Sequence, residues 1–296
     1  MRRRWLVPLA WTVLLSLGGC AHHDAGSKNG FAPEPPPLAP EPPSADSATV
    51  GLWHFDERSG PRVQDSGPFR MNGVAGPDAR VEFGRFKSAR SFTATVQSFV
   101  VVPYNPVMES PRAFTVEAWI FINAISSFEL SPIAMRWSPI PTEQSWVFGV
   151  VGRRLAASTT PSPGWFDEVV GPFITGRLVF AFRPETANSL QRFSSSTTLP
   201  TDRWVHVAAT VDGEVVRIYV DGRLDVQVAV ANGIKRSDAP LVIGNALDPR
   251  RLTDLSGELK QDLANSPLPW YALNGLVDEL RISNTARKEF ESTDAR

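Results

Sequence analysis

Acidic side chains are the residues of this chain best suited to do chemistry, and their spacing argues against catalysis. Hydrolysis of a glycosidic bond needs two carboxyl groups that flank the bond. The chain has adjacent acidic pairs at Asp167-Glu168 and Asp278-Glu279, and neighbouring residues of a strand point to opposite faces. It has no Gly-x-Ser-x-Gly elbow and no His-x-x-x-His metal pair. We therefore expect a protein that is not an enzyme.

The single cysteine, Cys20, follows three arginines at residues 2–4 and an apolar run at residues 5–17. This order is typical of a secretory signal peptide, and the run is shorter than the roughly 20 residues that a membrane span needs. Leu17-Gly18-Gly19-Cys20 resembles the lipobox of bacterial lipoproteins. The resemblance implies cleavage after residue 19 and a lipid anchor on Cys20. An ordinary cleaved signal with a chance cysteine is the alternative.

The residue after the cysteine is Ala21 rather than the aspartate that, in lipoproteins, signals retention in the inner membrane. We therefore expect the protein in the cell envelope, anchored to the outer membrane through the lipid on Cys20. Residues 20–46 are Pro-rich, which favours an extended polyproline II tether. The expected organisation is a signal peptide at 1–19, a lipidated tether at 20–46 and a folded domain at 47–296.

The composition supports a folded domain and gives no reason to expect nucleic-acid binding. The 296 residues are 42% hydrophobic and include nine tryptophans, enough to build a core. Loss of residues 1–19 would leave 27 basic against 31 acidic residues. Without a basic stripe, such a chain is no platform for a phosphate backbone.

The pattern beyond residue 47 is that of an all-β domain. Apolar residues alternate along Phe114–Ile122 and Val215–Val220, which predicts strands with one packed face. Asp212-Gly213 and Asp221-Gly222 separate apolar alternations and predict two hairpin turns, hence three consecutive antiparallel strands. Further strands are expected at 49–55, 99–102, 146–151, 178–182, 204–211 and 226–230. The leucine spacing at 253–265 predicts one short amphipathic helix.

Five motifs in order give the chain a family resemblance. They are Gly51-Leu52-Trp53-His54-Phe55-Asp56-Glu57, Phe114-Thr115-Val116-Glu117-Ala118-Trp119-Ile120, Arg203-Trp204-Val205-His206-Val207-Ala208-Ala209-Thr210, Ile218-Tyr219-Val220-Asp221-Gly222 and Asn274-Gly275-Leu276-Val277-Asp278-Glu279-Leu280-Arg281-Ile282. Together they resemble the laminin-G-like branch of the concanavalin A-like lectin/glucanase superfamily. The resemblance implies a jelly-roll sandwich of two antiparallel sheets with adjacent first and last strands, here with the short helix in a late insertion.

The resemblance also implies a structural calcium ion. In the family an Asp-Ser-x-Gly-x-x-x-Asn-Gly loop and a late Asp-Glu strand commonly share one, and the matching residues are Asp65, Asn72 and Asp278. Hard oxygen ligands of this kind suit Ca²⁺. Residues 68–71 depart from the usual small polar residues of the loop. The alternative is that Asp65 only initiates a turn through its side chain.

Long insertions are expected at 126–145, 153–176 and 246–271, and loops of this length are often functional. Their aromatic and cationic residues suggest a ligand-binding surface made by Trp165, Arg250, Arg251 and Trp270. Trp119 is expected on the face of its strand away from the core. His54 and His206 have apolar neighbours, which favours packing roles over ligation or catalysis.

The expected function is a membrane-tethered, non-catalytic binding module at the bacterial cell envelope that recognises a glycan or a partner protein. Two alternatives remain open, because one fold hosts many functions. The first is a structural or assembly component of an envelope complex. The second is a divergent glycoside hydrolase.

Overall fold

The computed structural model describes residues 41–292, apart from 111, 128–129, 154–168, 170, 172, 187–188, 232, 247 and 249–270. They belong to one compact unit of the chain, Ala39–Arg296. Within this described part the regular elements are strands and two 3-10 turns, η1 (Pro106–Met108) and η2 (Pro141–Glu143). The helix predicted at 253–265 lies outside the described residues. None of the described helical turns is long or apolar enough to span a bilayer.

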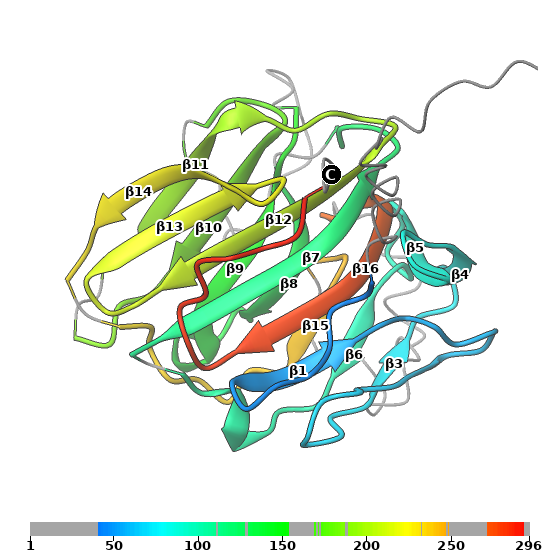
Figure 1. Ribbon diagram of the computed structural model, residues 1–296, viewed down its shortest axis with the longest axis horizontal. Coiled ribbons are helices and arrows are strands. Elements are labelled where there is room, and N and C mark those ends of the chain that lie inside the picture. The colour runs from blue at the N-terminus through cyan, green and yellow to red at the C-terminus, as the bar shows by residue number, and fades with distance from the viewer. Residues whose placement is uncertain are drawn as a thin grey trace, which may run out of the picture. The chain divides into compact units, whose positions relative to one another are not determined.

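The strands form two antiparallel sheets (Figure 1). Sheet A contains, in spatial order, β14 (Arg223–Ala229), β13 (Val215–Val220), β12 (Trp204–Val211), β7 (Phe114–Ile122), β16 (Asn274–Ser283), β5 (Ser88–Thr93) and β4 (Arg80–Phe83), with β1 (Thr49–Trp53) also paired to β16. Sheet B contains β11 (Gln191–Thr198), β10 (Arg177–Phe182), β9 (Gln144–Val151), β8 (Leu130–Trp137), β15 (Leu241–Ile243), β6 (Val100–Val102), β3 (Gly73–Ala75) and β2 (Arg62–Val63).

The local sequence explains the order of the strands in sheet A. Asp221 and Gly222 both have positive φ, 52° and 75°, which is the backbone of the two-residue hairpin that Asp-Gly favours. β12, β13 and β14 are consecutive and antiparallel as predicted. The first strand pairs with the last, since Trp53 lies opposite Leu280. The two-sheet, all-β jelly-roll expectation is therefore confirmed.

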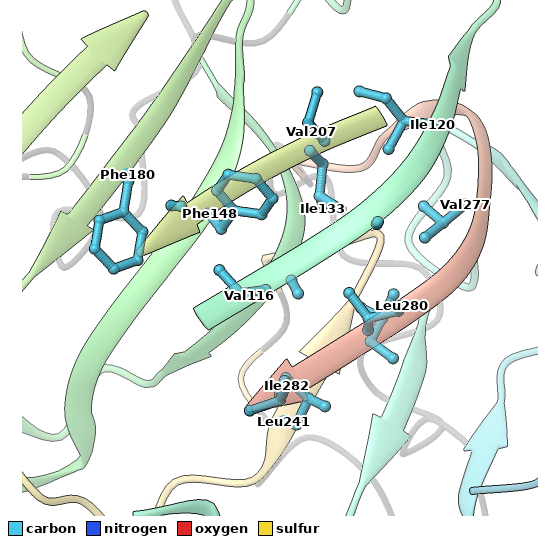
Figure 2. Close-up of a cluster of buried hydrophobic side chains, with 14 of the residues drawn as sticks. Val116, Ile120, Ile133, Phe148, Phe180, Val207, Leu241, Val277, Leu280 and Ile282 are labelled. Atoms are coloured by element: carbon cyan, nitrogen blue, oxygen red, sulfur yellow. The ribbon is translucent and has the colours of Figure 1, made fainter. Parts of the chain in front are cut away.

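The main core lies between the sheets. The face of β7 that carries Val116, Ala118 and Ile120 packs against residues of sheet B such as Ile133 and Phe148 (Figure 2). Each of these side chains is almost completely buried. The alternation predicted for residues 114–122 therefore gives the inward face of sheet A its apolar surface.

The central strands of sheet B, namely β6, β8, β9 and β15, are buried on both faces, and this overturns one expectation. Residues 126–145 are not simply an insertion, because β8 occupies Leu130–Trp137 and all eight of its side chains are buried. Pro132 makes this strand hard to predict, because proline is disfavoured in a central strand. In the structure Pro132 lies at a register shift between β8 and β9. Arg136 also argues against a buried strand, because a buried charge needs partners. Its guanidinium finds them in the backbone oxygens of Met108, Ser237 and Ala239.

Residues 285–292, here called the C-terminal strap, run across part of the outward face of sheet A (Figure 1). The ring of Phe290 lies 4.6 Å from that of Tyr219 and 5.6 Å from that of His206. Trp119 Nε1 donates to Glu291 Oε2 over 3.1 Å. Trp119 is consequently buried, although its strand directs it away from the core.

Candidate ligand-binding site

Two adjoining pockets open beside the loop that follows β1. One has a volume of about 580 Å³ and the other of about 520 Å³. The first is lined by His54, Phe55, Asp56, Glu57, Arg58, Ser59, Arg62, Gln64, Ser66 and Lys87. The second is lined by Arg58, Ser59, Gly60, Pro61, Ala75, Gly76, Pro77, Ala79, Arg80, Val81 and Arg90. Because Arg58 and Ser59 border both, we treat the two pockets as one site, the basin.

A buried arginine fixes the backbone of the basin. Arg90 on β5 is 1% exposed. Its Nη1 donates to the carbonyls of Gly60 (3.1 Å) and Ala79 (3.2 Å), and its Nη2 to that of Arg62 (3.0 Å). Nη2 also contacts Glu57 Oε2 at 3.3 Å. Burial lowers the pKa of Arg90, yet these four acceptors keep the guanidinium paired and hold the loop against β4 and β5.

The two acidic residues that line the basin already have partners. Asp56 Oδ2 lies 2.9 Å from Lys87 Nζ, and Asp56 Oδ1 accepts from the amide of Ser88. Glu57 pairs with Arg90 and accepts from the amide of Gln64 over 2.7 Å. These pairs position the carboxylates at the rim of the basin and neutralise their charge.

A second acidic pair lies behind the basin and is closed to solvent. Asp278 and Glu279 are 0% and 1% exposed. His54 Nδ1 contacts Glu279 Oε2 at 2.6 Å, and this bond raises the pKa of His54. Burial raises the pKa of Asp278 to about 8, although the amides of Phe86 and Glu279 donate to its oxygens. Burial also raises the pKa of Glu279.

Neighbouring residues of a regular strand point to opposite faces, but Asp278 and Glu279 lie at a bulge and both are buried. Glu279 has a left-handed φ of 52°, and the pairing of β16 with β7 shifts register between Asp278 and Arg281. Such a bulge interrupts the strict alternation of a strand. Glu279 Oε1 is buried and has no hydrogen-bond partner within the part of the chain that is described.

The residues predicted to share a calcium ion are only partly brought together. Asp65 and Asn72 are neighbours, since the amide of Asp65 donates to Asn72 Oδ1 over 3.0 Å. The Asp65 carboxylate is occupied by the amides of Leu52, Gly67 and Met71. Asp278 instead contacts Phe86 on the β4–β5 turn. Among the described residues no cluster of three or more His, Cys, Asp or Glu is arranged for a metal. Calcium binding by Asp65, Asn72 and Asp278 stays a prediction from sequence.

The other predicted site residues lie outside the described residues. These are Cys20 and the four residues expected to bind ligand, Trp165, Arg250, Arg251 and Trp270. Trp137, from the expected insertion at 126–145, and Trp146, which directly follows it, are core residues on β8 and β9.

Sequence reasoning missed the basin itself. Its lining comes from three separate segments of the chain. Among the lining residues, only His54 was considered individually from the sequence, as a packing residue, and in the structure His54 contacts Glu279. A signal was present in the charged run Asp56-Glu57-Arg58-Ser59-Gly60 directly after an apolar strand. Such a run predicts a polar surface loop, but not that Arg80 and Lys87 would meet it.

Known structures share this fold. The binding domain of Paraclostridial Mosquitocidal Protein 1 matches with a TM-score of 0.53 and 12% identity over 81% of this chain and 49% of its own. The binding domain of botulinum neurotoxin serotype D/C VPI 5993 matches at 0.51 and 14%, over 81% and 49%. That of serotype G matches at 0.50 and 12%, over 83% and 49%. The chain thus spans about half the length of these structures.

No curated protein matches the sequence. The family model for the concanavalin A-like lectin/glucanases superfamily matches residues 94–291. This range runs from the end of β5 through β16 and into the C-terminal strap. With two antiparallel sheets and paired first and last strands, the chain belongs to the concanavalin A-like lectin/glucanases superfamily.

Proposed function

We propose that this protein is a membrane-tethered, non-catalytic binding module of the bacterial cell envelope that recognises a glycan in the basin. The basin is the observation that carries the proposal. Pockets of 300–1,000 Å³ with a few placed polar groups are typical of small-ligand sites, and both of its parts fall in this range.

The lining of the basin suits a polyhydroxylated ligand. Arginine and lysine supply donors, Asp56 and Glu57 supply acceptors, and Gln64 supplies both. Phe83 does not line either pocket, but it is 94% exposed at the end of β4, two residues after Val81, which does. The face of an aromatic ring attracts partly positive groups, which include the C–H groups of a sugar.

The arrangement of acids supports a non-catalytic role. The two carboxylates that reach the basin are held by Lys87 and Arg90. The pair with raised pKa values, Asp278 and Glu279, is closed to solvent. A glycosidase needs two carboxyl groups that reach the same bond, and the basin offers no unpaired one among the described residues.

The tether and the location rest on the sequence alone. Lipidation of Cys20 and a stiff spacer at 20–46 would hold the domain away from the outer membrane. Binding domains of toxins have the same fold, which supports a binding role for this domain. A calcium ion held by Asp65, Asn72 and Asp278 would be structural.

The test is binding of the full-length protein, purified in non-ionic detergent, to a broad glycan array in calcium and again in EDTA. We expect specific binding to a glycan, and we expect Gln64→Ala, which removes an uncharged donor and acceptor from the basin, to weaken it. The matched control is Asn284→Ala, which removes an exposed side-chain amide that is not part of the basin. Absence of binding to every glycan would reject the proposed function and shift attention to a protein partner. A lower thermal midpoint of the wild type in EDTA would support the calcium prediction.

A further inference from the structure

Three arginines of the basin lack a partner. The guanidinium groups of Arg58, Arg62 and Arg80 make no ion pair or hydrogen bond with any described residue, and all three residues are exposed. Arg58 borders both pockets, Arg62 one and Arg80 the other. Free guanidinium groups therefore extend along the whole basin.

The basin carries an excess of positive charge, although the chain as a whole does not. It is lined by four arginines and one lysine but by only two carboxylates. Both carboxylates are paired, with Lys87 and Arg90. The whole chain carries a formal net charge of −1. A hollowed surface with an excess of one charge concentrates ligands of the opposite charge. The basin therefore favours anionic ligands.

We propose that the basin binds an acidic polysaccharide, whose sugar carboxylates pair with Arg58, Arg62 and Arg80. This inference rests on the proposed glycan-binding function and names its substrate class. Guanidinium groups bind carboxylates in bidentate pairs, which gives both attraction and orientation. Arg58 stands where two successive sugars would meet, because it belongs to both pockets.

The number of free arginines in the basin selects among anionic polymers. Asp56 and Glu57 directly precede Arg58 in sequence and line the same pocket as Arg62, but Lys87 and Arg90 already pair them. A chain with several charges on each sugar would leave most of its anionic groups without a cationic partner, because three guanidinium groups of the basin are free within the described part of the chain, whereas a polymer with about one carboxylate per residue can place each charge at an arginine. The expected ligand is therefore a uronic-acid polymer rather than a highly sulfated one.

The experiment measures binding of the full-length protein, in non-ionic detergent with EDTA, to three soluble polymers: polygalacturonate, neutral dextran and dextran sulfate. Polygalacturonate is expected to bind most tightly, and raised salt should weaken it. Each of Arg58→Ala, Arg62→Ala and Arg80→Ala should weaken it about tenfold, as expected for loss of a charged hydrogen bond. Arg112→Ala, an exposed arginine outside the basin, is the matched control and should bind like the wild type.

The outcomes separate this inference from the proposed function. Equal binding to dextran and polygalacturonate would overturn the acidic ligand while glycan binding stands. Tighter binding to dextran sulfate would overturn the carboxylate assignment. Binding to polygalacturonate that all three substitutions leave unchanged would overturn the basin as the site. Absence of binding to all polymers here and to every glycan of the array would reject both proposals. Thermal unfolding of each variant shows that a loss of binding is not a loss of fold.

Discussion

His54 Nδ1 lies 2.6 Å from Glu279 Oε2, a contact that joins the residue after the first strand of the domain to the last strand. Glu279 reaches it because the bulge in β16 gives this residue a left-handed φ of 52°. Beside it, Asp278 accepts from the amide of Phe86 on the β4–β5 turn. The contact thus connects the basin loop to a buried acidic pair.

Stability should fall as pH rises from about 5.5 to 8.5. His54, Asp278 and Glu279 all have raised pKa values, and that of Asp278 is raised to about 8 by burial. The folded state therefore binds more protons than the unfolded chain across this range, and its free energy of unfolding decreases as they are lost. Thermal midpoints measured in this window should decline by on the order of several degrees.

Asp278→Asn is the matching variant, since it cannot ionise. Its thermal midpoint should depend less on pH than that of the wild type and exceed it most at pH 8.5. Below about pH 4 the thermal midpoint of the wild type should instead rise as pH rises. The hydrogen bond to Arg287 lowers the pKa of Asp46, and for Glu117 the partners His206 and Arg281 outweigh a burial effect that would raise its pKa. A midpoint that rises between pH 5.5 and 8.5 would contradict this interpretation.

Asp65→Ala should destabilise the protein by roughly 2–4 kcal/mol, because it leaves three buried amides without an acceptor. These amides belong to Leu52, Gly67 and Met71. Urea unfolding in calcium and in EDTA measures the effect, and an equal loss in both is expected from backbone capping. Asn72→Ala, which removes one acceptor on an exposed residue, should cost less. A loss seen only in calcium would favour the metal instead.

Phe290→Ala should loosen the C-terminal strap and destabilise the protein by about 1–2 kcal/mol, as expected when a half-buried aromatic ring is removed. Its ring packs on Tyr219 and His206. Tryptophan fluorescence should become easier to quench by acrylamide, because Trp119 lies under the same strap. Lys288→Ala, an exposed position of the strap, is the control and should change neither property. Unchanged stability of Phe290→Ala would show that the strap adds little to the fold.

Arg136→Met should be more damaging than its similar size suggests. The Arg136 guanidinium donates to three buried backbone oxygens, and burial lowers its pKa to about 10. Methionine fills the space but leaves the oxygens of Met108, Ser237 and Ala239 without their donor, at a cost of roughly 3 kcal/mol or more. Urea unfolding measures it, with Arg112→Met as the exposed control. A loss below about 1 kcal/mol would mean that the loops rearrange to pair these oxygens.

The regular strands could be read from the sequence because their signals are local. The bounds predicted for 114–122, 204–211 and 215–220 are those of β7, β12 and β13. Side chains alternate along any strand, and Asp-Gly favours the hairpin backbone wherever it occurs. The family motifs added the pairing of the first strand with the last. The fold class and its antiparallel core could therefore be predicted from one chain.

Three features depend on tertiary structure: the existence of strand β8, the burial of Trp119 on the outward face of sheet A, and the basin. Pro132 and Arg136 argue locally against a strand, yet neighbours in space accommodate both. Trp119 is buried by a strap about 170 residues further along the chain. The basin forms only where the β1–β2 loop meets β4 and β5, fixed by Arg90. Which charges remain unpaired there depends on distances between remote segments, and periodicity along the chain carries no such information.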